Sequence, residues 1–575
     1  MTPGRTDTTF AIPLWLVWLA AAGFVLAGLG SHALLDNNEG LYAEVAREML
    51  AGPDWRAWVI PHLNGLPYME KPPLLFWLTA LSFQLFGLNE FAARLVPALA
   101  SLGCVALILH FGMQHRRVLV ARMAALMFVS GVGVCAMSRV LMFDMLLTVM
   151  LTASLMAAYQ VIVGGEVPTA RKAALRSAYA FLALAVLAKG LVAGVLFVLV
   201  VGAVLAERHR SPSAFFNACR QFLDVPALLL FALIAAPWHV AASLVEARFA
   251  WFYFINEHVL RFLGQRMPHD YYTGSWWYYL PRMAIYLFPW SLLLPCLLLG
   301  QRADVPIMNS ETPALETDRL GRFLWIAWVV PLLFFSISSA KANYYLVTVM
   351  PFAALHLSLM LEKRRFLVGH AAAALPGLMI ALLALALCVA LSLQAPRSHQ
   401  LMSIAGMGER GFVLRTLSIV IVLALVAGLL AWRMRRIGLL AYMGVPALVI
   451  GATAFVAVAA EPLVSARALS AYARVAMAGR TLYLYRDFEE VSSLPFYMGT
   501  TIPVVDSHSN DLYWGNRLRP GNEAIVSTEQ FRARLGQQKI VIALTSRQLA
   551  DFSVTPYFPL FKGSRRVGDT LLFYN

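Results

Sequence analysis

The stretch RVLMFDMLLTVMLTASLMAAYQVIV (residues 139–163) decides the fold class of this chain. It is long enough to cross a bilayer, because about 20 apolar residues span a hydrocarbon core of about 30 Å. Arg139 and Asp144 lie where this apolar run begins. A charge near lipid costs about 2.5–3.5 kcal/mol on insertion scales, so such residues mark functional sites in membrane proteins. We therefore expect an α-helical polytopic membrane protein with a site at this end of its spans.

The composition of the whole chain supports this class. Of 575 residues, 60% are hydrophobic and 13% are charged. The first apolar run resembles a signal peptide, but it is long and has no clear cleavage site, so we interpret it as a retained span. The apolar runs predict thirteen crossings, near residues 11–29, 91–113, 118–136, 143–163, 177–188, 190–206, 225–244, 279–299, 322–339, 343–361, 366–392, 413–432 and 438–459.

The net charge is +15, and the distribution of the basic residues along the chain predicts its orientation in the membrane. Six short loops between apolar runs carry three basic residues each, such as Arg208, Arg210 and Arg220, and they alternate with the other loops. This is the positive-inside pattern, and it argues against a nucleic-acid partner. We expect a multi-pass protein of a bacterial inner membrane, with a cytoplasmic N-terminus and a periplasmic C-terminal region.

The pattern divides the chain into two domains. Residues 1–460 form the membrane domain, in which 31–90 is the first periplasmic loop with surface helices at 39–50 and 74–86. Residues 461–575 have short β-like runs, and Ser527-Thr-Glu-Gln530 has the spacing of a capping box. We predict a small extracytoplasmic α/β domain there.

In this topology the unusual polar residues all face the periplasm. No nucleotide pool exists on that side, so an enzyme there needs a donor that is activated before it crosses the bilayer, and a polyprenyl-phosphate sugar fits. Its chemistry needs a carboxylate to accept a proton and cations to hold the departing phosphate. The candidates are Asp36, Glu39, Tyr42, His62, Lys71, Asp144, Lys189, Glu257, His258, Arg261, Lys341 and Tyr345.

Several of these residues also have a structural interpretation. Asp36 and Glu39 have the spacing of an N-cap pair for the following helix. Lys71 is consistent with a snorkelling lysine, and Lys189 with a topological anchor. The histidines show no ligand spacing on one element, so we expect no metal and no other cofactor.

A family resemblance runs through the same segments. NEGLYAEVAREM (38–49), PHLNGLPYMEKPPL (61–74) and the motifs around Asp144, Lys189 and Glu257 resemble the protein O-mannosyltransferase-like glycosyltransferases. The pattern is most similar to the bacterial branch that contains the aminoarabinose transferase of lipid A. The resemblance implies a GT-C fold and metal-independent, inverting transfer from an undecaprenyl-phosphate sugar.

By position, the resemblance implies that Lys71 holds the donor phosphate, and that Asp144 and an acid of the first loop shape the acceptor site. This chain departs from the aminoarabinose enzymes, which read Asp-Glu-Thr-Arg-Tyr where it reads Asn38-Glu-Gly-Leu-Tyr42. We therefore expect Glu39, or else Asp36, to be the base. Lys189, Lys341 and Tyr345 are expected to assist at the phosphate.

The sequence thus predicts a monomeric glycosyltransferase that moves a sugar from undecaprenyl phosphate to lipid A or another envelope glycolipid. A protein hydroxyl is the alternative acceptor. A secondary transporter is the alternative from another class, but transporters usually show related halves and charges near the midplane. Here the charges gather at one face, and no duplication is visible.

Overall fold

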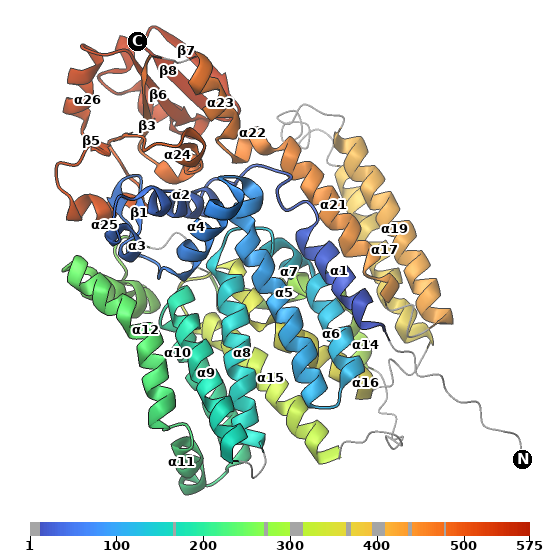
Figure 1. The fold of residues 1–575 in the computed structure, drawn as a ribbon. Helices are drawn as coiled ribbons and strands as arrows, with labels where there is room; N and C mark the ends of the chain where they lie inside the picture. Colours follow the sequence, from blue (N-terminus) through green and yellow to red (C-terminus); the bar gives the residue numbers. More distant parts are fainter. Residues whose placement is uncertain are drawn as a thin grey trace, which may run out of the picture.

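The fold is a bundle of membrane helices with a small sheet at one end (Figure 1). A computed structural model describes residues 12–164, 168–269, 274–299, 314–363, 370–393, 409–434, 440–476 and 479–575. The apolar helices of the bundle are α1 (Leu14–Leu26), α5 (Glu90–Gln114), α6 (Val118–Ser130), α8 (Phe143–Val163), α9 (Pro168–Lys189), α10 (Val192–Arg208), α12 (Val225–Val245), α15 (Ala314–Ile337), α16 (Met350–Lys363), α17 (His370–Leu393), α19 (Glu409–Arg433) and α21 (Gly444–Ala459).

Helix lengths confirm a polytopic membrane protein. Among the described residues, seven helices are long and apolar enough to cross a membrane, and four apolar helices are shorter. Helix α8 has the bounds predicted for its span. It lies inside the bundle, since 72% of its most apolar 18-residue stretch is buried, whereas the value for α12 is 22%. The span expected at 279–299 is broken instead, into α13 (Tyr279–Tyr286), a 3-10 turn at Trp290–Leu292 and α14 (Leu293–Leu299). Its interruption coincides with Pro289, which cannot donate a helical hydrogen bond.

The segment after α1 forms two helices at the positions that the sequence predicts. Helix α2 spans Asn38–Ala51 and α4 spans Leu74–Phe86. Between them lie the short helix α3 (Arg56–Val59) and a hairpin of β1 (His62–Leu63) and β2 (Leu66–Pro67). Figure 1 shows α2 and α4 across the end of the bundle, beneath the sheet.

The C-terminal residues form one six-stranded sheet in the order β5-β4-β3-β6-β8-β7. The parallel strands β3 (Thr481–Tyr485), β4 (Val504–Val505), β5 (Ile525–Val526) and β6 (Ile540–Thr545) fall on the predicted β-like runs. The capping box at Ser527 is confirmed and begins α26 (Thr528–Leu535). The antiparallel strands β7 (Gly563–Val567) and β8 (Thr570–Tyr574) were not predicted.

The sheet region packs directly on α2. A Cβ at Gly40 would lie 2.6 Å from the backbone of Ser493, so only glycine allows this approach. The carboxylate of Asp36 accepts a hydrogen bond from the Ser493 amide at 2.8 Å. Asp36 therefore does not cap α2, as the N-cap interpretation required, but joins the start of α2 to the sheet region. The N-cap position belongs to Asn37, whose side chain makes no capping bond.

Candidate functional site

A cavity of about 650 Å³ lies at the end of the bundle that carries the sheet. We call it the main cavity. The first turn of α8, the start of α10 and the end of α15 form its walls, together with the loops before α4 and after α12. Aliphatic and aromatic side chains such as Val195, Leu199 and Phe334 cover much of the wall. Six charged side chains project into it: Glu70, Lys71, Asp144, Lys189, Glu257 and Arg261.

Asp144 and Lys189 form an ion pair in this wall. Asp144 lies in the first turn of α8, is 1% exposed, and faces the last residue of α9 because the two helices pack side by side. The Lys189 ammonium also lies 4.5 Å from the ring centroid of Tyr345 and 5.2 Å from that of Tyr344. These rings and the carboxylate stabilise a lysine that otherwise would be costly at this depth.

The turn after Lys189 depends on a glycine. Gly190 has a φ of +90°, and a Cβ there would lie 2.4 Å from Nε2 of His258. The Leu191 amide donates to the same Nε2 at 3.0 Å, and the other ring nitrogen of His258 is 2.6 Å from the Tyr253 carbonyl. The imidazole is therefore neutral, and burial lowers its pKa. His258 holds the α9–α10 turn in place.

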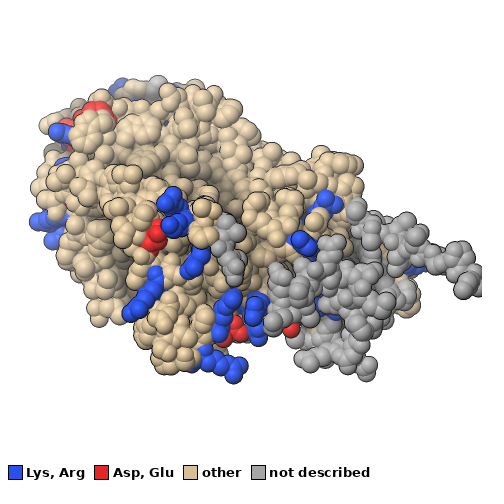
Figure 2. Space-filling view, turned by 60° about the horizontal axis from the view of Figure 1, so that its bottom comes forward, with Lys and Arg blue, Asp and Glu red and all other residues tan. Residues whose placement is uncertain are grey.

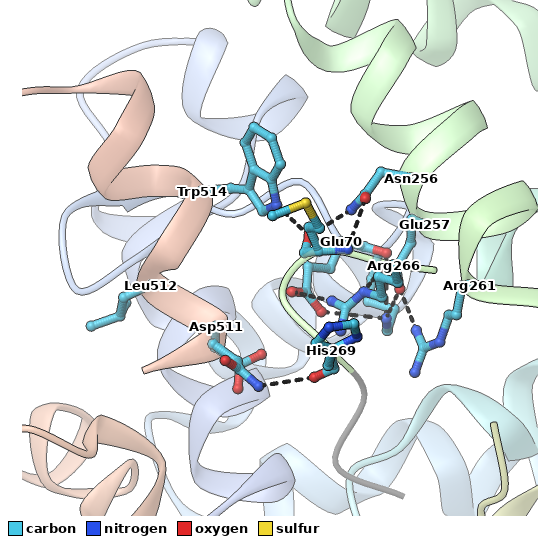
Figure 3. A network of polar contacts seen from close by, with 12 residues as sticks. Glu70, Asn256, Glu257, Arg261, Arg266, His269, Asp511, Leu512 and Trp514 are labelled. Carbon is cyan, nitrogen blue, oxygen red and sulfur yellow. Dashed lines mark hydrogen bonds and ion pairs between the residues drawn. The ribbon is translucent and has the colours of Figure 1, made fainter. Parts of the chain in front are cut away.

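Glu257 is the centre of a second charged cluster (Figure 3). It lies on η1 (Trp251–Leu260), a π-helix, next to His258. Its carboxylate accepts from Lys71 at 2.9 Å and from Nε of Arg266 at 2.7 Å, and it also pairs with Arg261. Burial raises the pKa of this carboxyl, but the three cations together hold it below its ordinary value. Glu257 is therefore ionised and fixes the cations of this wall.

Two members of this cluster escaped the sequence analysis. Arg266 also donates to Glu70 at 2.6 Å, and the Lys71 ammonium lies 3.7 Å from the Glu70 carboxylate. Glu70 directly precedes Lys71 in the sequence, which is the one local signal for it. Arg266 gives no such signal, because nothing adjacent to it in the sequence pairs with its charge.

A helix of the sheet region holds the loop that carries Arg266. Helix α25 (Asn510–Leu518) places Trp514 so that its indole N–H donates to the Met267 carbonyl at 2.7 Å. Asn510 donates to the His269 carbonyl at 3.2 Å. From the other side, Asn256 of η1 bonds both backbone groups of Met267. Figure 3 shows α25 and η1 on opposite sides of this loop.

The structure corrects the expected position of Glu39. Its carboxylate is 1% exposed and binds Arg94 through both oxygens, at 2.7 and 2.8 Å. The same oxygens accept from the amides of Leu35 and Leu141. Glu39 thus lies outside the main cavity, with its lone pairs occupied. The missing signal was Arg94, a buried cation near the start of the predicted span 91–113.

Three other candidates also lie outside the main cavity. Lys341 donates to the carbonyls of Phe335, Ser336 and Ser338 and so terminates α15. His62 belongs to the β1–β2 hairpin, and Asp36 binds the sheet region as described above. The candidates that do line the main cavity are Tyr42, Lys71, Asp144, Lys189, Glu257, His258, Arg261 and Tyr345.

This arrangement suits an anionic amphiphile. In the described part of the chain, no group of three or more His, Cys, Asp or Glu side chains has the geometry of a metal site. The cations Lys71, Lys189 and Arg261 can instead stabilise a phosphate directly. The aliphatic wall can hold the hydrocarbon that follows such a phosphate.

Comparison with known proteins agrees with this chemistry. A family model described as dolichyl-phosphate-mannose-protein mannosyltransferase matches residues 10–253. The undecaprenyl phosphate-alpha-4-amino-4-deoxy-L-arabinose arabinosyl transferase of Pseudomonas aeruginosa PAO1 is 30% identical over 435 residues, which are 73% of this chain and 71% of that protein. The protein of the same name from Aeromonas salmonicida is 32% identical over 345 residues, or 59% of this chain, and the match spans only 57% of its own length.

A solved structure shows the same fold. The crystal structure of ArnT from Cupriavidus metallidurans bound to undecaprenyl phosphate superimposes with a TM-score of 0.77. The alignment covers 98% of this chain and 97% of that one, at 21% sequence identity. The expected GT-C architecture is therefore confirmed.

Proposed function

Because this chain belongs to the family of undecaprenyl phosphate-aminoarabinose arabinosyl transferases, we propose that it transfers a sugar from an undecaprenyl-phosphate donor to an envelope glycolipid, with lipid A as the first candidate. The observation that carries the proposal is the grouping of Lys71, Lys189 and Arg261 in one aliphatic cavity. Lysine and arginine bind phosphate oxygens through charge-assisted hydrogen bonds. We also propose that the chain acts as a monomer.

The donor phosphate takes the place of carboxylates as partner of these cations. Lys71 and Arg261 both contact Glu257, which keeps Arg266 as a partner when they turn to the phosphate. As the bond between sugar and phosphate breaks, negative charge grows on the phosphate, and fixed cations stabilise that charge. Inversion follows from attack by the acceptor on the opposite face of the sugar.

Asp144 is the carboxylate that we propose as base for the acceptor. Glu257 is held by three cations, whereas Asp144 has an ion pair with Lys189 alone among those described here. When Lys189 binds the donor phosphate, Asp144 is free to accept a proton. This assignment replaces Glu39, whose oxygens are occupied by Arg94.

The basic face supports the orientation that we propose for the chain in the membrane. Figure 2 shows the end of the bundle away from the sheet, where Lys and Arg side chains predominate over Asp and Glu. By the positive-inside rule this face lies in the cytoplasm. The main cavity and the sheet then lie in the periplasm. Labelling from outside the cell tests this in a chain whose five native cysteines are replaced by serine. A single cysteine at the exposed Lys539 is expected to react, and one at the exposed Arg220 is not.

The activity is tested by sugar release from a purified undecaprenyl-phosphate-sugar donor. The Lys71→Ala chain is expected to lose at least about 100-fold in rate, since one preorganised donor to a developing anion contributes that much. Lys539→Ala, an exposed lysine of the sheet region, is the matched control and should keep full activity. Full activity of Lys71→Ala would overturn the proposal.

Residues 10–253 match a family of protein mannosyltransferases, which supports a protein as the alternative acceptor. In that case the sugar goes to a protein hydroxyl. Mass spectrometry of lipid A and of envelope glycoproteins from a deletion strain separates the two acceptors. Loss of a sugar from lipid A alone supports the first.

A further inference from the structure

A second cavity, of about 240 Å³, lies between the other ends of α8, α10 and α15. We call it the arginine pocket. Four arginines and one glutamate at its rim form most of its accessible lining, and largely buried aliphatic and aromatic side chains form its floor. The lining residues are Tyr159, Ile162, Val163, Val204, Glu207, Arg208, Arg210, Arg319, Arg322, Phe323 and Ile326.

The charge of this pocket is strongly unbalanced. Glu207 forms an ion pair with Arg322 at 2.9 Å, which leaves Arg208, Arg210 and Arg319 as an excess of three positive charges among its lining residues. All three are exposed. Like charges held at one rim repel each other unless an anion lies between them. Arginine is suited to such an anion, because its planar fork matches two oxygens of a phosphate.

The apolar wall gives the second half of the argument. The rings of Tyr159 and Phe323 stack with centroids 4.1 Å apart and an interplanar angle of 18°. Ile162, Val204 and Ile326 extend this wall between the helices. A lipid headgroup brings glycerol and methylenes next to its phosphate, so it can contact both the arginines and the small apolar floor.

The depth of the pocket also fits a lipid headgroup. Asp144 lines the main cavity and Ile162 lines the arginine pocket, and both belong to α8. Their separation of 18 residues corresponds to about 27 Å along a helix at about 1.5 Å per residue. The hydrocarbon core of a bilayer is about 30 Å thick. If the main cavity lies at one membrane surface, the arginine pocket therefore lies at the other, at the ends of α8, α10 and α15 away from the sheet (Figure 1).

We propose that the arginine pocket binds the headgroup phosphate of an anionic phospholipid from the leaflet opposite the main cavity. Basic pockets between membrane helices on this side of a membrane are typical sites for anionic lipid headgroups. The lipid phosphate lies among Arg208, Arg210 and Arg319, and its glycerol and first methylenes lie against Ile162 and Ile326. The site is independent of the transfer reaction, and its occupancy stabilises the contact of α8, α10 and α15.

The test uses the full chain in detergent, with binding followed by native mass spectrometry. Dioctanoyl phosphatidylglycerol is the anionic probe and dioctanoyl phosphatidylcholine the zwitterionic one. We expect phosphatidylglycerol to bind at least tenfold more tightly. The double variant R208Q/R319Q should lose that preference, and Arg220→Gln should keep it. Arg220 is the matched control because it is an exposed arginine at the end of α11 (Pro212–Arg220), at the same end of the bundle.

A second variant separates the pocket from the general charge of the face. Ile162→Trp leaves every arginine in place but fills the apolar part, and it should also lose phosphatidylglycerol. Because the main cavity contains cations as well, the titration is repeated with Lys71→Ala, which should bind phosphatidylglycerol normally. Circular dichroism and gel filtration of each variant show that it is folded.

Four outcomes would overturn the proposal. The first is equal binding of the two lipids, and the second is an equal loss of phosphatidylglycerol binding in Arg220→Gln. The third is a loss of phosphatidylglycerol binding in Lys71→Ala but not in R208Q/R319Q. The fourth is complete competition by inorganic phosphate at the same concentration as the lipid. The last outcome would assign the pocket to a free phosphate ion instead of a lipid.

Discussion

The ammonium of Lys71 lies 2.9 Å from Oε1 of Glu257, although 186 residues separate the two in the sequence. Lys71 comes from the loop before α4, and Glu257 comes from η1. The contact joins a loop and a helix that meet only at the end of the bundle. It also holds a cation at the wall of the main cavity, where a phosphate can replace the carboxylate as its partner.

This contact lets one substitution separate activity from stability. Lys71→Met leaves Glu257 paired with Arg261 and Arg266, so we expect a small change in Tm but at least about a 100-fold loss of sugar release. Glu257→Gln removes the anion that three cations share, and it should lower both activity and Tm. Thermal unfolding and donor turnover of the two variants check this. A large fall in Tm with Lys71→Met would contradict it.

The pair of Asp144 and Lys189 is expected to behave as one unit. Either Asp144→Asn or Lys189→Met leaves a buried charge without its partner, which costs about 3–5 kcal/mol of stability. The double variant should cost clearly less than the sum of the two single ones. Thermal unfolding of the three variants in one detergent measures this coupling, and strict additivity would show that the pair is not formed.

Glu39 is expected to be structural. Glu39→Gln leaves Arg94 buried without a charged partner, so Tm should fall. The rate per folded molecule and its pH profile should stay within about twofold of the parent, because the side chain lies outside the main cavity. Donor turnover normalised to the folded fraction is the measurement. Loss of one limb of the pH profile at unchanged folded fraction would restore Glu39 as the base.

Trp514 is expected to act on the site through the loop of Arg266. Trp514→Ala removes the hydrogen bond to Met267 and the ring contact with Phe252 at 5.3 Å. We expect about a tenfold lower kcat/KM, since small displacements of binding groups are costly. Trp514→Phe keeps a ring and should lose less, and Tyr513→Phe on the same helix is the control. Equal losses in Tyr513→Phe and Trp514→Ala would point to general damage of α25.

Asp36 should make stability depend on pH. Burial raises the pKa of Asp36 to about 7 from a usual value of 3.8, partly opposed by its hydrogen bond from Ser493. Between these values the folded chain holds a proton that the unfolded chain has released, so this group lowers stability as pH rises from about 4 to 7 and adds no further change above that. Asp36→Asn should remove this decline. At pH 8 we therefore expect the variant to gain about 2 kcal/mol in its free energy of unfolding, relative to its value at pH 4, compared with the parent chain, a figure reduced because the side chain is half-buried. Thermal unfolding of both chains from pH 5 to 8 checks the sign.

The sequence predicted most of the fold because the relevant signals are local. The bounds of α8 and α4 and the capping box at Ser527 each depend on residues within one or two helical turns. The break at Pro289 within an expected span was less visible, because a proline inside a membrane helix is often tolerated. Strand β7 was missed because Ser564, Arg565 and Arg566 make its sequence polar. Strand β8 has an apolar, strand-like sequence at Thr570–Tyr574, and the sequence analysis did not use that signal.

The sequence by itself determined that the chain is a polytopic membrane protein of this family and that Lys71, Asp144, Lys189 and Glu257 are unusual. Apolar length and the cost of a charge near lipid are properties of single segments, so they can be recognised without a structure. Only the tertiary structure decided which charged residues form ion pairs. Arg94 pairs with Glu39, Lys189 pairs with Asp144, and Arg266 pairs with both Glu70 and Glu257. The reason is that an ion pair forms by proximity in space, and packing brings together groups that are far apart along the chain.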